Sequence, residues 1–107
     1  MNAQKQQLLN NIILDLAENY QENTKELINS ILDDGITNAF IISKRIKNED
    51  NLKILIPEIK DYVKTIYLRR GTEDVNSLSE SGRSSNFEDA LEKMRTNIVR
   101  NGKRVLI

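Results

Sequence analysis

Few residues in this chain belong to the types that carry acid–base, nucleophilic or metal chemistry. The sequence has neither histidine nor cysteine, so the commonest general base, the thiolate nucleophile and the usual transition-metal ligands are missing. Two carboxylate pairs, Glu49-Asp50 and Glu88-Asp89, stand where solvated helix ends are expected. Asp33-Asp34-Gly35 resembles a fragment of a calcium-binding loop, but the other ligand positions of such a loop are absent from the sequence around it. We therefore expect no catalytic residue, no metal site and no cofactor, and predict that the protein is not an enzyme.

Arginines supply a second kind of candidate site, because Arg69, Arg70 and Arg83 are suited to contacting phosphates. The chain as a whole is balanced, with 16 basic and 16 acidic residues, which argues against a strongly basic surface that tracks phosphates. Residues 1–67 carry a net charge of −2 and residues 68–107 a net charge of +2. A small helical nucleic-acid-binding regulator that uses these arginines and the basic C-terminal end stays open as an alternative function.

The length of 107 residues predicts one domain, spanning residues 1–107. Apolar residues make up 38% of the chain and aromatic residues 5%, so the core should be small and aliphatic. We see no secretory signal, and no apolar run approaches the ~20 residues of a membrane helix. We expect no membrane association, and synthesis in the cytoplasm.

Apolar residues recur at helical spacing in four stretches of the sequence. The expected helices cover residues 3–20, from Asn23 or Thr24 to about Lys47, from Pro57 in a first turn to Arg70-Gly71, and from a cap at Ser84, Ser85 or Asn86 to Asn101-Gly102.

The second stretch contains the turn-forming dipeptide Asp34-Gly35, yet its apolar residues keep the same helical spacing from Ile28 to Phe40. We favour one continuous helix with a weak point at Gly35, where glycine costs ~1 kcal/mol relative to alanine. Asn48–Asn51 is expected to be a polar connection. The predicted fold class is all-α: a small bundle of about four helices, with a long polar loop between the third and fourth helices and a short extended C-terminal tail.

The polar stretch from Tyr67 to Phe87 contains five serines and two glycines. Connections inside compact domains usually have ~4–6 residues, and those beyond ~12–15 tend to be functional or disordered. Val75 and Leu78 are apolar residues spaced within this stretch, which favours a loop over 71–87 that becomes fixed against a neighbouring subunit. The tail Lys103–Ile107 either adds a strand to a partner's sheet edge or is a frayed end, and both readings stay open.

The segment YLRRGTEDVNSLSESGRSSNFE, residues 67–88, resembles the signature of the head–tail connector (adaptor, or head-completion) family of long-tailed phages. In that family an apolar helix ends in an aromatic residue followed by Arg-Gly, then Glu, a Ser- and Gly-containing run, an aromatic residue and a second helix. The matching positions are Tyr67, Arg70, Gly71, Glu73, Ser77, Ser79, Gly82, Ser84 or Ser85, and Phe87. The chain departs from the pattern at Asp74 and Ser81, where the family often has glycine, and at Arg83, where an apolar residue is common.

The resemblance implies a structural virion protein at the head–tail junction. Such α-helical subunits form a ring, typically a dodecamer, beneath the portal protein, and dock the next connector, stopper or tail-completion protein. DNA passes through the lumen of the ring without sequence-specific binding. By this analogy the loop 71–87 and the C-terminal arm 100–107 contact the portal or adjacent copies. The residues expected to take part are Arg69, Arg70, Gly71, Glu73, Val75, Ser77, Leu78, Ser79, Gly82, Arg83, Phe87, Lys103, Arg104, Val105, Leu106 and Ile107.

Overall fold

The computed structural model describes residues 2–71 and 80–105, and all regular secondary structure in these residues is helical. This confirms the predicted all-α class with four main helices. They are α1 (Asn2–Leu16), α2 (Lys25–Ser43), α3 (Glu49–Gly71) and α4 (Glu80–Arg100), with two short 3-10 turns, Ala17–Asn19 and Glu22–Thr24, between α1 and α2.

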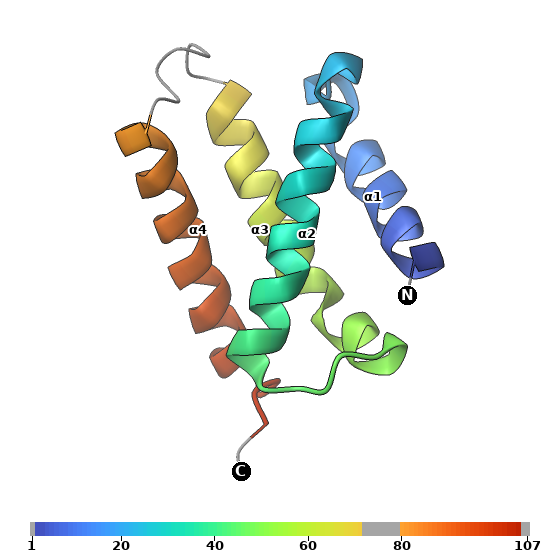
Figure 1. Ribbon diagram of the computed structural model, residues 1–107, viewed down its shortest axis with the longest axis vertical. Coiled ribbons are helices and arrows are strands. Elements are labelled where there is room, and N and C mark those ends of the chain that lie inside the picture. The colour runs from blue at the N-terminus through green and yellow to red at the C-terminus, as the bar shows by residue number, and fades with distance from the viewer. Residues whose placement is uncertain (1, 72–79, 106–107) are drawn as a thin grey trace.

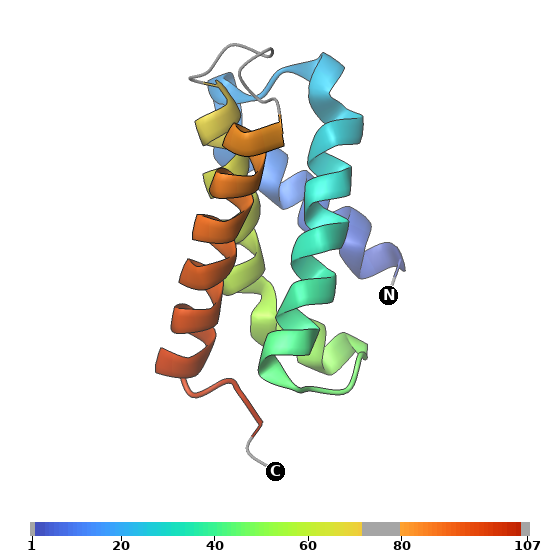
Figure 2. The same ribbon diagram turned by 60° about the vertical axis from the view of Figure 1, so that its left-hand side comes forward.

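Helices α2, α3 and α4 lie side by side, and α3 runs antiparallel to both of its neighbours (Figure 1). Helix α1 crosses α2 and α3 obliquely, on the side away from α4, as the second view makes clear (Figure 2). This topology creates two ends. We call residues 16–27, 67–71 and 80–90 the upper end, and residues 43–58 and 98–105 the lower end.

The core is aliphatic, as the composition predicted. The ten largest fully buried apolar side chains each contribute ~1.5–3 kcal/mol by leaving water. They come from all four helices: Leu8, Ile12, Ile28, Leu32, Leu52, Leu55, Ile59, Val63, Met94 and Ile98.

Helix α2 is continuous through Gly35, which confirms the preferred interpretation of that stretch. The reason for a glycine there is a close approach to α3. A Cβ atom on Gly35 would lie 2.9 Å from Cδ1 of Tyr62 and 3.6 Å from Cγ2 of Val63. The Tyr62 hydroxyl donates a hydrogen bond of 2.5 Å to Oδ2 of Asp34, so the ring is held across the glycine. The residue that looked like a weak point is therefore a packing requirement.

Helices α1 and α2 both end earlier than expected. Helix α1 ends at Leu16 instead of Tyr20, because Ala17 adopts a left-handed backbone with φ of 51°. Helix α2 ends at Ser43 instead of Lys47, because Lys44 has φ of 59° and donates its backbone N–H to the Phe40 carbonyl at 3.0 Å. Ile46, which falls inside the expected helix but beyond the observed one, is consequently 79% exposed.

Helix α3 begins at Glu49, so the predicted start near Pro57 and the predicted connection over Asn48–Asn51 are wrong. The Asn48 side chain caps the helix, since its Oδ1 accepts the backbone N–H of Asn51 at 2.8 Å. Pro57 lies inside the helix, where it costs ~3 kcal/mol. Leu52 and Leu55 are fully buried in the turns before it, and their burial together with the cap outweighs that cost.

Helix α4 begins at Glu80, so the expected cap at Ser84, Ser85 or Asn86 is wrong and residues 80–87 of the predicted loop are helical. The predicted end at Asn101-Gly102 is confirmed. Gly102 has φ of 69° and donates its N–H to the Val99 carbonyl at 3.1 Å, while the Lys103 N–H reaches the Ile98 carbonyl at 3.0 Å. This pair of bonds is a Schellman motif, which needs the left-handed backbone that glycine adopts without strain.

The packing at Gly35 leads to a prediction on stability. Replacing Gly35 by Ala gains ~1 kcal/mol of helix propensity. The new methyl group would press on the buried Tyr62 ring, and overpacking of this kind typically costs ~1–3 kcal/mol. We expect Gly35→Ala to lower the free energy of unfolding in urea, whereas Thr37→Ala, at an exposed position of the same helix, should stay within about 0.5 kcal/mol of wild type. A more stable Gly35→Ala variant would contradict the close approach.

Candidate functional site

At the upper end, Tyr67 fixes the last turns of α3 against the connection between α1 and α2. Its side chain is 3% exposed, and its ring stacks on Tyr20 with centroids 6.2 Å apart. Its hydroxyl accepts the Gln21 backbone N–H at 2.9 Å and lies 2.7 Å from Oγ1 of Thr24. Because the Thr24 hydroxyl donates to the Gln21 carbonyl at 2.5 Å, the Tyr67 hydroxyl is the donor to Thr24. The aromatic position of the signature is thus an anchor inside the fold.

Arg69 and Asp89 join the ends of α3 and α4 across the upper end. Nη1 of Arg69 lies 3.5 Å from Oδ2 of Asp89, and the two side chains are 41% and 66% exposed. Ion pairs this open to solvent contribute ~0–1 kcal/mol, so the pair adds orientation more than stability.

The structure settles the backbone of some predicted interaction residues. Arg70 and Gly71 form the end of α3, and Gly82, Arg83 and Phe87 lie in α4. Glu73, Val75, Ser77, Leu78, Ser79, Leu106 and Ile107 lie outside the described residues.

At the lower end, the sequence analysis missed a buried carboxylate. Glu58 is 3% exposed, and its two oxygens are both occupied. Nζ of Lys103 donates to Oε1 at 2.9 Å, and Nδ2 of Asn101 donates to Oε2 at 2.8 Å. The signal was present in the sequence, since Glu58 falls on the same helical stripe as Leu55 and Tyr62. An acidic residue on a buried stripe needs a cation, and burial without one is costly.

Further contacts hold the C-terminal segment to the end of α2. Nε of Arg45 donates to the Lys103 carbonyl at 2.6 Å, and its Nη1 donates to Oδ1 of Asn51 at 3.2 Å. The backbone N–H of Val105 donates to the carbonyl of Ser43 at 2.7 Å. The described part of the predicted arm 100–107 is therefore attached to its own bundle, while Arg104 is exposed.

Two of the acidic residues considered for chemistry engage neighbouring groups. Asp33 forms an ion pair with Lys5, and Asp34 accepts the Tyr62 hydroxyl. Burial, and then the hydrogen bond to Asp34 and its negative charge, raise the pKa of Tyr62 well above its ordinary value of 10.0. Within residues 2–71 and 80–105, no group of three or more acidic residues is arranged to hold a metal ion. In the same residues, no helix has both the length and the apolar character that crossing a membrane requires.

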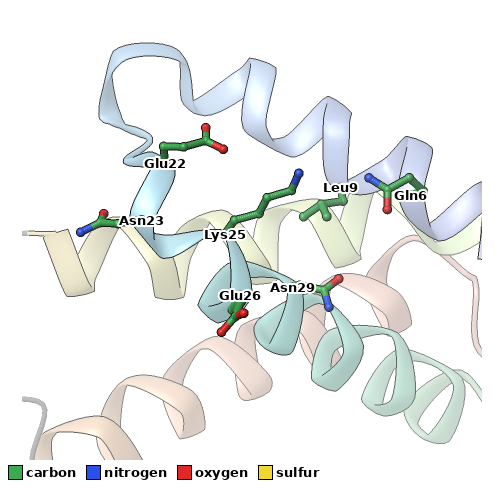
Figure 3. Close-up of a pocket in the computed structure, with 7 residues that line it drawn as sticks. All are labelled: Gln6, Leu9, Glu22, Asn23, Lys25, Glu26 and Asn29. Carbon is green, nitrogen blue, oxygen red and sulfur yellow. The ribbon is translucent and has the colours of Figure 1, made fainter.

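One open hollow lies between α1 and the start of α2, with a volume of about 540 Å³ (Figure 3). Leu9 forms an apolar part of its lining, and Lys25 extends from α2 toward α1. The lining is otherwise polar and acidic: Gln6, Glu22, Asn23, Glu26 and Asn29. Lys25 shares this lining with Glu22 and Glu26, so the hollow carries charges of both signs.

No family model, curated protein or solved structure matches the chain.

The Glu58 cluster gives a prediction on the C-terminal segment. Replacing Lys103 by Met leaves the Glu58 carboxylate buried without its cation, so we expect the free energy of unfolding to fall by ~3–5 kcal/mol. Adding Glu58→Gln to that variant removes the buried charge and should recover part of the loss. Urea unfolding of the single and double variants measures both effects. Equal stability of Lys103→Met and wild type would show that the pair does not hold the segment.

The raised pKa of Tyr62 gives a prediction on alkaline pH. The unfolded tyrosine ionises near pH 10, whereas the folded one ionises only at higher pH. The stabilisation is therefore fully present below about pH 10 and is lost as the pH rises toward the folded pKa. Stability should fall above pH ~10 less steeply in Tyr62→Phe than in wild type. While both proteins remain folded, tyrosinate absorbance should rise by the same amount in Tyr62→Phe and in wild type, because Tyr62 stays protonated in the folded protein. The chain has three tyrosines. A rise in the variant that is one third smaller than in wild type would show that Tyr62 ionises in the folded state and would contradict its protection.

Proposed function

We propose that this chain is a head–tail connector (adaptor) subunit of a long-tailed phage. It is a structural component of the virion at the head–tail junction, without catalytic activity. Its copies form a ring beneath the portal protein, extend the DNA channel and dock the next connector or tail-completion protein. The ring leaves DNA free to pass, because a subunit with no net charge does not neutralise phosphates overall.

The observation that carries this proposal is the position of the connector-like signature in an all-α bundle. The signature starts at Tyr67, in the last turns of α3, and its final residues lie in the first turns of α4. The resemblance implies this order of helices. Tyr67 is tied to Gln21 and Thr24, and Arg69 is paired with Asp89, so the end of α3 and the early turns of α4 are both anchored in the bundle. A recognition segment carried by a rigid helical frame suits a docking protein.

A sharp test of this proposal substitutes the two apolar residues of the polar segment. In the variant Val75→Ser/Leu78→Ser we expect unchanged helical circular dichroism and loss of binding to portal rings of the same phage, measured by co-sedimentation. Asn76→Ser, between them in the sequence, is the matched control and should bind the portal as wild type does. A deletion of Val75–Ser81 is less suitable because it removes the start of α4.

Infection supplies a second measurement. A phage whose only copy of the gene carries Val75→Ser/Leu78→Ser should accumulate filled heads without tails. Fully infectious particles with both substitutions would overturn the role of the segment. Tight binding of duplex DNA that weakens steeply with salt, and is lost in Arg70→Ala, would favour the nucleic-acid-binding regulator instead.

A further inference from the structure

Positive charge gathers at the lower end of this neutral chain. The lower end carries seven basic and three acidic side chains, a net charge of +4, whereas the described side chains of the upper end are mainly acidic. The basic residues of the lower end are Lys44, Arg45, Lys47, Lys53, Arg100, Lys103 and Arg104. Helix dipoles account for the cations that close α2 and α4, Lys44 and Arg100, but Lys47, Lys53 and Arg104 lie beyond those last turns.

Backbone contacts bring the cations of the C-terminal segment and of the end of α2 together (Figure 1). The N–H of Val105 bonds to the carbonyl of Ser43 at 2.7 Å, so the segment that carries Arg104 lies against the end of α2, where Lys44 follows. Both cations are exposed. Two parts of the chain that are about 60 residues apart thus form one basic surface.

Arg45 adds a partly buried charge to this surface. Its Nε donates to the Lys103 carbonyl and its Nη1 to the Asn51 amide oxygen, and both acceptors are neutral. The guanidinium is therefore held in place while its positive charge remains uncancelled. Lys47, two residues further on, is exposed. The basic surface is thus built on a side chain that the fold fixes, and it is not only a set of solvated lysines.

Exposed aliphatic side chains gather at the same end. Among residues 2–71 and 80–105, six large aliphatic side chains are exposed. Three of them belong to the lower end, Ile46, Ile54 and Val99, and a fourth, Ile41, lies one turn before Lys44 in α2. Ile46 is the most exposed of all, at 79%. Such side chains stabilise a complex when another protein covers them, whereas the phosphate backbone of a nucleic acid offers them no apolar partner.

We propose that the lower end is a docking surface for an acidic segment of another protein, one that carries carboxylates together with an aliphatic side chain. In this contact Lys44, Lys47 and Arg104 face the carboxylates, and the aliphatic side chain covers Ile46. A protein is favoured over a nucleic acid because the cations are accompanied by exposed aliphatic residues, and because the lower end contains no aromatic residue on which a base could stack. Only the identification of this partner with the next connector or tail-completion protein rests on the proposed function.

A charge reversal on the full-length protein tests the basic part of the surface. The probe is a fluorescein-labelled peptide of Glu-Glu-Leu repeats, and its binding is measured by fluorescence anisotropy in ~0.1 M salt, where remote charges are screened. We expect Lys47→Glu to weaken binding at least roughly fivefold, because like charges then meet. Lys25→Glu is the matched control, since it makes the same change in net charge at an exposed position of the upper end. It should change the affinity by less than about twofold.

A second pair of variants tests the aliphatic part. Ile46→Ser should weaken binding of the Glu-Glu-Leu peptide at least about threefold, because the leucine loses its apolar contact. The same variant should bind poly-glutamate as wild type does. Leu14→Ser, at an aliphatic residue of α1 that is 74% exposed, is the control and should bind both probes as wild type does. Both positions are open to solvent, so circular dichroism should show unchanged folding in both variants.

Three outcomes would overturn the docking surface: no measurable binding of the peptide, equal losses in Lys47→Glu and Lys25→Glu, or binding that is unchanged in Ile46→Ser. Tighter binding of duplex DNA than of the peptide would assign the lower end to nucleic acid instead. The portal assay keeps the two proposals apart. A wild type that binds portal rings but not the peptide would leave the connector function standing without this surface, whereas peptide binding without portal binding would do the reverse.

Discussion

The close contact of α2 with α3 at Gly35 is the constraint on which the bundle depends. The Tyr62 ring fills the space where a side chain at position 35 would lie, and its hydroxyl is fixed by Asp34. Two antiparallel helices held this closely leave a groove on one side for α4 and a face on the other for α1. A thin aliphatic core with few aromatic residues gains much from such a fixed point, because the remaining side chains then pack against a defined surface.

The charge pattern is a consequence of this topology more than of the order of residues. Along the sequence, the first 67 residues carry a net charge of only −2 and the rest a net charge of +2. Antiparallel packing places the start of α2, the end of α3 and the start of α4 at the same end of the bundle, so Glu22, Glu26, Glu88 and Asp89 all lie toward that end. The ends of α2 and α4 meet at the opposite pole, together with the C-terminal segment. A weak charge bias along the sequence therefore becomes a separation of charge between the two ends of the molecule when the chain folds.

Periodicity was sufficient to predict the number and type of the helices and most of the core, because burial of Leu and Ile dominates the energetics of a small bundle. Helix ends were less predictable, since they depend on single backbone conformations such as the left-handed Ala17 and Lys44, and on one cap, Asn48, that outweighs the signal of Pro57. The polar contacts at Glu58 were not predicted, because its partner Lys103 is 45 residues away and no local pattern joins them. The connector-like signature is read from sequence alone, and its central residues lie outside those the structure describes.

The Glu58 cluster links stability to the lower surface. Lys103 neutralises the buried carboxylate, and its carbonyl then receives Arg45, which also binds Asn51. Val105 binds the last residue of α2, and the Asn51 side chain donates to the Ile46 carbonyl at 2.7 Å. The connection that displays Ile46 is therefore fixed on both sides by groups belonging to the C-terminal segment and the start of α3. A surface ordered before binding loses less entropy when a partner arrives. The C-terminal segment thus acts inside its own subunit, where it fixes the neighbouring connection between α2 and α3.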